Sequence, residues 1–373
     1  MKRLGVVIVT WIAVLALAEC AVTIFVGPTG RKTIDEFEWM IQDPVRGWMN
    51  LPGYRHSDRK TLRINSLGLR GPEFAIPKPP GVLRILCLGD SATFGIQGVM
   101  PSIYDGNYPE TLASLLSARG ATRIEIVNAG VIGYSSSHGL RFLATTGLDL
   151  EPDIVTVRFG FNDHVPSWNP PLRQAESRNP LFRELLYATH DLELVRLGLN
   201  AYQSRPSLHP EKFSGPWVSP EEFEYNLQRI VDLSRDTGAH VLFIDYPLRR
   251  VERGMGQMED RWLGFWGNAT LAEFHEKHYG YQQIANDVAS ANGVPVVETR
   301  PLLEVADPPG FDDIDLVHPI EPGVRIIANA VLDRLVQLDW IPAENLPAAA
   351  RTADRNPARI AEPPGPTRKD ATQ

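Results

Sequence analysis

Residues 82–95 of the chain read Val-Leu-Arg-Ile-Leu-Cys-Leu-Gly-Asp-Ser-Ala-Thr-Phe-Gly. Residues 82–88 are apolar apart from Arg84, and such a run is typical of a strand buried on both faces of a parallel sheet. The strand stops at Gly89, and the polar pair Asp90-Ser91 follows directly. In sheets of this kind, functional side chains gather beyond the carboxyl ends of the strands. The stretch therefore predicts an α/β fold with a candidate nucleophile, Ser91, at one edge of its sheet.

The same alternation of apolar runs and helical periodicity continues to residue 338. Further strands are predicted at residues 124–129, 154–159, 241–246 and 294–297. Helices are predicted at residues 108–119, 136–146, 221–237, 270–292 and 321–338. Strands that alternate with helices form a parallel sheet covered by helices on both faces. The sequence therefore predicts an α/β fold with a five-stranded parallel sheet.

Three more polar patterns lie near the ends of these elements. Gly133 follows the second predicted strand, and Gly160-Phe161-Asn162-Asp163 follows the third. Asp315-Leu316-Val317-His318 lies in a loop before the last predicted helix. Because parallel strands end at the same edge of a sheet, we expect Ser91, Gly133 and Asn162 to lie close together.

These residue types together suit acyl transfer. Serine is a weak nucleophile that needs a base within hydrogen-bond reach, and His318 is the candidate base for Ser91. Asp315, three residues before the histidine, can accept a hydrogen bond from the imidazole and fix its tautomer. The backbone N–H groups of Ser91 and Gly133 and the side-chain amide of Asn162 can stabilise an oxyanion.

Each pattern taken alone has a structural alternative. Ser91 can cap a helix, Gly133 can be a plain turn glycine, and Asn162 can form an Asx-turn. Gly130, three residues before Gly133, competes for the same role. Asp163 is expected to brace its loop rather than to react.

The four patterns together resemble the SGNH, or GDSL-type, hydrolase superfamily over residues 82–338. The serine block of that family is similar to Gly89-Asp90-Ser91, with Ala92 in place of the name-giving leucine, and its glycine block is similar to residues 128–133. The Gly-x-Asn-Asp and Asp-x-x-His blocks are intact. The resemblance favours Gly133 over Gly130. It implies a flavodoxin-like three-layer α/β/α fold and ester hydrolysis or acyl transfer without a metal or other cofactor.

The N-terminus carries a different kind of signal. Residues 4–26 form an almost unbroken apolar run behind Met1-Lys2-Arg3. A run of this length can span a bilayer as a helix, and the basic pair favours a cytoplasmic N-terminus. We therefore expect a single-pass membrane anchor over residues 1–26, with the catalytic domain on the extracytoplasmic side. The main alternative is a cleaved signal peptide that ends at Ala16-Leu17-Ala18 and releases a secreted or periplasmic protein. A core helix is the other alternative.

The rest of the chain divides around the α/β region. Residues 27–80 are rich in Pro, Gly and polar side chains, and they are predicted to be an extended connector arm that packs on the main domain. The hydrolase domain is predicted to span residues 81–340, with inserts at 165–220 and 249–267 that can cover the site. Residues 341–373 hold few large apolar side chains and are predicted to be a disordered tail.

Charge and histidine spacing exclude some functions. The net charge is −8 and no basic patch stands out, so nucleic acid is not an expected partner. His138 and His164 lie near the site patterns without the spacing of paired ligands, so no metal site is predicted. Arg158 lies within a strand that should be buried and therefore needs a partner. Asp245, at the end of a neighbouring strand, is the predicted partner; the alternative is that Arg158 extends to the edge of the sheet.

The function that these observations favour is that of an envelope esterase acting on a small acyl ester, such as an O-acyl group of a glycan or a lipid. An O-acyltransferase would use the same acyl-serine chemistry with an alcohol in place of water. The third alternative is a non-catalytic binding module on this fold. The sequence keeps a residue of the required type at every candidate catalytic position, which argues against that alternative.

Overall fold

The computed structural model describes residues 2–26, 33–34, 37–57, 62–96, 106–165, 179–203, 216–249, 270–311 and 315–341. Apart from residue 249, the predicted second insert lies outside the described residues. The predicted tail also lies outside them, apart from residue 341.

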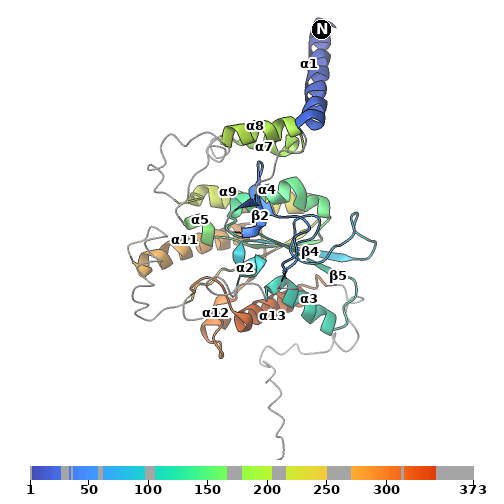
Figure 1. Cartoon of the computed structure of the whole chain (residues 1–373). Coiled ribbons are helices and arrows are strands. Elements are labelled where there is room, and N and C mark those ends of the chain that lie inside the picture. The colour runs from blue at the N-terminus through green and yellow to red at the C-terminus, as the bar shows by residue number, and fades with distance from the viewer. Residues whose placement is uncertain are drawn as a thin grey trace, which may run out of the picture.

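A five-stranded parallel sheet forms the centre of the molecule (Figure 1). Its strands are β4 (Leu83–Gly89), β5 (Ile124–Gly130), β6 (Ile154–Arg158), β7 (His240–Ile244) and β8 (Val296–Val297). They lie in the order β5-β4-β6-β7-β8, and all neighbouring pairs are parallel. This is the strand order of flavodoxin-like folds. Such folds bind ligands at the switch point, where successive strands begin to be added on the other side of the first strand. Here that point lies between β4 and β6.

Helices cover both faces of the sheet (Figure 1). One face carries α4 (Ser136–Phe142), α9 (Pro220–Asp236) and α11 (Leu271–Ala291). The other face carries α3 (Tyr108–Ala118) and α13 (Glu321–Gln337). Alternate residues of β4 point to the two faces: Leu86 packs in the core beneath α9, and Ile85 packs in the core beneath α13. The predicted three-layer α/β/α fold is confirmed.

Short helical segments follow several strands at the carboxyl edge or connect the longer elements. They are α2 (Ser91–Phe94), the π-helical turn η2 (Leu143–Gly147), the 3₁₀ turn η3 (Leu148–Leu150), α5 (Phe161–His164) and α12 (Arg300–Glu304). The segments α2 and α5 begin directly after β4 and β6, so they lie at the point where the winding direction changes.

The connector arm holds a small sheet that the sequence did not predict. Its antiparallel strands are β1 (Thr33–Ile34), β2 (Phe37–Asp43) and β3 (Gly47–Asn50). Trp39 and Met40 of β2 are buried in the same core as residues of the central sheet. The Asn50 side chain also donates a hydrogen bond to the Gly130 carbonyl at 3.4 Å. Within the described residues, the arm therefore packs on the α/β body, and its strands β2 and β3 form a hairpin.

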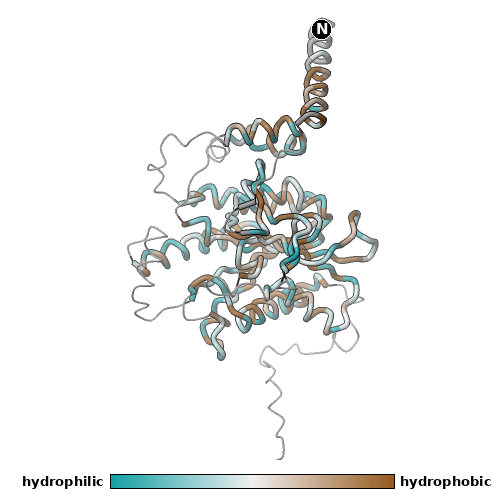
Figure 2. Tube along the Cα trace, in the orientation of Figure 1, coloured by the Kyte–Doolittle hydropathy of each residue, from teal (hydrophilic) through white to brown (hydrophobic). Residues whose placement is uncertain are grey.

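The N-terminal helix α1 (Lys2–Ala21) continues into the π-helical turn η1 (Val22–Val26) and stands away from the body (Figures 1 and 2). Its C-terminal end contacts α8 (Glu193–Gln203), where the Glu19 carboxylate accepts hydrogen bonds from the N–H groups of Glu193 and Leu194 at 2.6 and 2.9 Å. The expected membrane anchor has no support here, because a search of the described residues finds no helix with both the length and the apolar character needed to cross a bilayer.

The first insert forms two helices, α7 (Pro180–Thr189) and α8, in place of the single helix predicted around residues 181–202. Leu186 and Leu199 are buried together with Val45 of the arm. Leu181 and Leu185 lie on the opposite side of α7 and are 80% and 61% exposed. One face of the hairpin therefore packs on the arm, and the other faces solvent.

Arg158 is fully buried, but its predicted ion pair with Asp245 is wrong. The guanidinium Nε donates to the backbone carbonyl of Asp245 at 3.4 Å, and the guanidinium lies over the Tyr246 ring at 4.5 Å. The Asp245 carboxylate accepts instead from the N–H groups of Thr299 and Arg300, at 2.8 and 3.0 Å. These donors at the start of α12 satisfy the carboxylate, so it does not turn toward the arginine.

Candidate active site

Ser91 is the first residue of α2 and follows the end of β4. The Asp90 side chain caps α2 by accepting a hydrogen bond from the Ala92 N–H at 3.0 Å. Ser91 is 6% exposed, and its Oγ lies 2.8 Å from Nε2 of His318. The tight turn from strand to helix therefore turns the hydroxyl toward an imidazole that comes from 227 residues away.

His318 and Asp315 form a compact turn before α13. His318 Nδ1 lies 2.8 Å from Asp315 Oδ2. The other carboxylate oxygen, Oδ1, accepts hydrogen bonds from the backbone N–H groups of Val317 and His318 at 2.8 and 3.1 Å. The carboxylate thus fixes both the loop and the imidazole, and it leaves Nε2 facing Ser91.

The Asp315 carboxyl is almost completely buried. Burial by itself would raise its pKa, but the neighbouring His318 and the backbone hydrogen bonds outweigh that effect and hold the pKa below its usual value. Asp315 therefore stays ionised at neutral pH, as a group that orients an imidazole and stabilises its charged form must.

The structure distinguishes the two glycines that compete for the oxyanion role. The Gly130 N–H donates to the Asn128 side chain at 2.9 Å, and a Cβ on Gly130 would lie 2.2 Å from the Phe94 backbone nitrogen. Gly130 is thus a packing residue that lets α2 approach β5. Gly133 has a φ of +78°, which favours glycine, and no acceptor among the described residues takes its N–H.

Asn162 lies in α5, next to the point where the winding direction changes. Its Nδ2 donates to the Tyr134 carbonyl at 2.9 Å and to Asp90 Oδ2 at 3.2 Å. Both amide hydrogens of Asn162 therefore have acceptors within the protein. An oxyanion can be stabilised by this amide only if it shares or replaces the longer of the two hydrogen bonds, which is the one to Asp90.

Asp90 is a site residue that the sequence reasoning did not select. It is fully buried, and besides Ala92 and Asn162 it accepts a hydrogen bond from the Tyr246 hydroxyl at 3.2 Å. Burial raises the pKa of Asp90 to about 6, although the Ala92 N–H and the charge of Arg158 oppose the shift. The position of Asp90 next to Ser91 is a sequence signal that could have identified it. The contact of Tyr246 with the Asp90 carboxylate is visible only in the fold.

Asp163 holds the loop behind Asn162 in place, as the sequence predicted. Its carboxylate accepts from the Ser136 N–H at 2.9 Å and from the Gly160 N–H at 3.0 Å. These contacts join the start of α4 to the start of α5, and they leave Asp163 completely buried.

Two histidines near the site form a buried pair. His164 Nε2 lies 3.2 Å from His278 Nδ1, and burial lowers the pKa of both residues, that of His278 to about 3. Both are therefore neutral, and they pack among aromatic rings. Within the described residues, no group of three or more His, Cys, Asp or Glu side chains could hold a metal ion.

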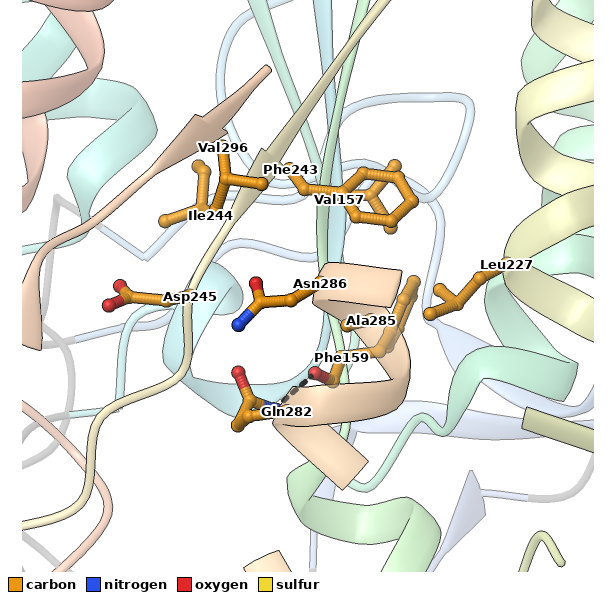
Figure 3. A pocket seen from close by; sticks show the side chains of 10 residues that line it. All are labelled: Val157, Phe159, Leu227, Phe243, Ile244, Asp245, Gln282, Ala285, Asn286 and Val296. Atoms are coloured by element: carbon orange, nitrogen blue, oxygen red, sulfur yellow. Dashed lines mark hydrogen bonds between the residues drawn. The ribbon is translucent and has the colours of Figure 1, made fainter. Parts of the chain in front are cut away.

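A small cavity lies beneath α11, between that helix and β6 and β7 (Figure 3). Its volume is about 10 Å³, roughly enough for a single water molecule. Gln282 lines it and links the two strands, because its amide donates to the Phe159 carbonyl at 3.3 Å and accepts from the Tyr246 N–H at 2.8 Å. None of its lining residues is one of the predicted site residues, so we regard it as a packing defect and not as the substrate site.

Comparison with known proteins identifies a family for this chain. The model of the GDSL-like lipase/acylhydrolase family matches residues 87–326. That range contains all five predicted site residues, from Ser91 to His318. No curated protein matches the chain.

Several solved structures have a similar fold. A lipase/acylhydrolase from Enterococcus faecalis is 16% identical, with a TM-score of 0.44 over 69% of this chain and 97% of its own. A catalytic mutant of Axe2, an acetylxylan esterase from Geobacillus stearothermophilus, is 18% identical, with a TM-score of 0.43 over 69% and 96%. Est24, a carbohydrate acetylesterase from Sinorhizobium meliloti, is 16% identical, with a TM-score of 0.44 over 69% and 99%.

The buried carboxyl of Asp90 makes stability depend on pH. An aspartate in an unfolded chain has a pKa of about 3.9, whereas that of Asp90 is raised to about 6 in the native state. Above pH 6 the ionised group therefore costs the native state roughly 3 kcal/mol, and this cost disappears below about pH 4.

The substitution Asp90→Asn should separate this cost from the role of the carboxylate in the site. From pH 4 to pH 7, the free energy of unfolding of the variant should rise by up to roughly 3 kcal/mol relative to the native chain. We expect kcat to fall at least about tenfold, because an amide cannot accept hydrogen bonds from Ala92, Asn162 and Tyr246 together. Urea unfolding at several pH values and ester hydrolysis measure the two effects. The exposed Asp149→Asn is the control, and a stability difference independent of pH would contradict the assignment.

Proposed function

Because the chain belongs to the GDSL-like lipase/acylhydrolase family and is a carboxylic ester hydrolase, we propose that Ser91, His318 and Asp315 form its catalytic triad. The observation that carries the proposal is the continuous pair of contacts from Ser91 Oγ to His318 Nε2 and from His318 Nδ1 to Asp315, each 2.8 Å long. A nucleophile, a base and a group that orients the base are what an acyl-serine mechanism needs.

In the proposed mechanism, Ser91 Oγ attacks the ester carbonyl carbon while His318 Nε2 removes the hydroxyl proton. The carbonyl oxygen becomes an oxyanion, held by the backbone N–H groups of Ser91 and Gly133 and by the Asn162 amide. When this intermediate collapses, the bond to the alcohol oxygen breaks and His318 returns the proton to that oxygen. Water then attacks the acyl-serine by the same route and releases the acid and free Ser91.

Two structural features support these oxyanion donors. The Ser91 N–H lies at the first position of α2, where no residue of the helix can accept it. The Tyr134 carbonyl anchors the Asn162 amide from the side of β5, next to Gly133. If the Asn162 amide exchanges its hydrogen bond to Asp90 for one to the oxyanion, the amide–substrate hydrogen bond is stronger in the transition state than in the ground state, as catalysis requires.

Replacing Ser91 by alanine tests the proposal. Ester hydrolysis by Ser91→Ala should fall by roughly a thousandfold or more, because the nucleophile is lost, while the thermal unfolding temperature stays close to that of the native chain. Covalent labelling by a fluorophosphonate should disappear at the same time. Ser137→Ala is a matched control in α4, and it should keep both activity and label. Labelling that persists on another serine of Ser91→Ala would disprove the assignment.

The acyl acceptor separates a hydrolase from an acyltransferase. The His318 side chain is 18% exposed, so water can approach the base that would activate it. We therefore propose hydrolysis, with the O-acyl group of an envelope glycan or lipid as the substrate class. With an activated ester and an excess of a sugar acceptor, mass spectrometry should detect free acid and little acylated sugar. Predominant acylation of the sugar would assign a transferase instead.

We also propose that the N-terminal helix is retained and that the enzyme acts on the extracytoplasmic side. The continuity of α1 from Lys2 through residues 16–18 to Ala21 supports retention. The Glu19 carboxylate then docks this helix on the start of α8, where it satisfies two N–H groups and interacts favourably with the helix dipole. N-terminal sequencing of protein from its own cells, together with protease accessibility in whole cells, tests both points. A mature N-terminus next to residue 19 would show that the segment is a cleaved signal peptide.

A further inference from the structure

Trp48, in strand β3 of the arm, lies directly against Gly133. Its Cζ2 atom lies 3.3 Å from the position that a Cβ on Gly133 would take. The indole Nε1 donates to the Ile132 carbonyl at 2.8 Å, and the Tyr134 hydroxyl donates to the Trp48 carbonyl at 2.7 Å. The indole therefore contacts Ile132 and Gly133, and the Trp48 backbone is bonded to Tyr134, so Trp48 contacts all three residues of the turn that contains the proposed oxyanion glycine.

The arm holds Trp48 in this place by several independent contacts. Arg46 Nη2 donates to the Thr146 hydroxyl at 2.6 Å, and Arg141 donates to the Val45 carbonyl at 2.9 Å. Val45 is itself buried, and the turn between β2 and β3 passes through Gly47 at a φ of +82°. These contacts attach the turn before Trp48 to the body at separate points, so the loss of one of them leaves the others in place.

Trp48 is part of an aromatic cluster that also includes the end of the first insert. Its ring centroid lies 4.6 Å from that of His138 and 5.8 Å from that of Trp217. The backbone N–H of Trp217 donates to the Val165 carbonyl at 2.9 Å, so the end of the insert returns to the chain three residues after Asn162. Trp48 and Trp217 are both only partly buried.

The sheet order shows on which side of Ser91 this cluster lies. Gly133 follows β5 at one edge of the sheet, and Ser91 follows the adjacent β4. His318 comes from the opposite direction, because its loop follows β8 and packs beside Tyr246, which follows β7. Trp48 therefore lies on the oxyanion side of Ser91, away from His318.

The geometry of the reaction places the acyl chain of the substrate on the Trp48 side of Ser91. The leaving alcohol oxygen must face His318, because it receives its proton from that residue. The oxyanion faces Gly133 and Asn162, so the remaining substituent of the tetrahedral carbon, the acyl chain, points away from His318. A partly exposed indole beside Gly133 is in the path of that chain.

We propose that Trp48 forms the wall of the acyl subsite and restricts the enzyme to esters of short-chain acids. This inference rests on the proposed role of Ser91 as the nucleophile. The arm thus supplies a residue that determines specificity, rather than a passive connection to the N-terminal helix. The hydrogen bond to Ile132 and the contacts with Gly133, His138 and Trp217 make the indole a rigid wall, because they oppose its rotation.

The substitution Trp48→Ala tests the wall. For the native chain, kcat/KM should be much higher for p-nitrophenyl acetate than for p-nitrophenyl octanoate. In Trp48→Ala the octanoate-to-acetate ratio of kcat/KM should rise at least about tenfold, since a pocket that gains several methylene positions discriminates less against chain length. Trp48→Phe, which keeps part of the wall and is less disruptive to folding, should shift the ratio in the same direction by a smaller factor.

A matched variant separates the wall from the attachment of the arm. Arg46 lies two residues before Trp48, and Arg46→Ala removes the hydrogen bond to Thr146 but keeps the indole. The octanoate-to-acetate ratio of this variant should therefore stay close to that of the native chain. An unchanged ratio in both Trp48 variants would overturn the inference, and so would an equal shift in Arg46→Ala. Fluorophosphonate labelling of Ser91 in every variant keeps the two hypotheses apart. Labelled Ser91 with an unchanged ratio rejects only the acyl wall, whereas an unlabelled Ser91 in the native chain rejects the proposed triad.

Discussion

The buried carboxylate of Asp90 joins the ends of three neighbouring strands. It caps the turn after β4 through the Ala92 N–H, it accepts from Asn162 after β6, and it accepts from Tyr246 after β7. A fully buried carboxyl is costly to ionise, and burial raises its pKa accordingly. Such a group is tolerated where its hydrogen bonds fix a geometry, and here they fix the candidate nucleophile relative to the candidate oxyanion amide.

The other site residues depend on contacts of the same kind. Asp163 joins the starts of α4 and α5, and Asp315 joins its own loop to the His318 imidazole. In each case one carboxylate satisfies two or more backbone N–H groups at a helix start or a tight turn, where no other backbone acceptor is available. Acidic side chains therefore hold this edge of the sheet rigid. The charged residues that surround Ser91 position the neighbouring loops and side chains as well as supporting the proposed reaction.

Elements outside the α/β body complete this edge. The β2–β3 hairpin brings Trp48 to Gly133, and the insert returns next to Asn162 through the hydrogen bond from Trp217 to Val165. The common α/β body carries the reactive groups, whereas these additions surround them. Differences in substrate among proteins of this fold are expected to arise from such additions, because loops and inserts at a sheet edge vary more freely than the strands beneath them.

The sequence by itself determined the α/β fold, the five strands and the five residues proposed for the reaction. Apolar runs and helical periodicity are local signals, and the blocks that contain Ser91, Asn162 and His318 follow these elements at short range. The tertiary structure decided what depends on distant contacts. It decided that Arg158 stacks on Tyr246 instead of pairing with Asp245, and that the arm folds as a hairpin. A buried polar side chain takes whichever partner the packing brings nearest, and that partner comes from a part of the chain that no local pattern identifies.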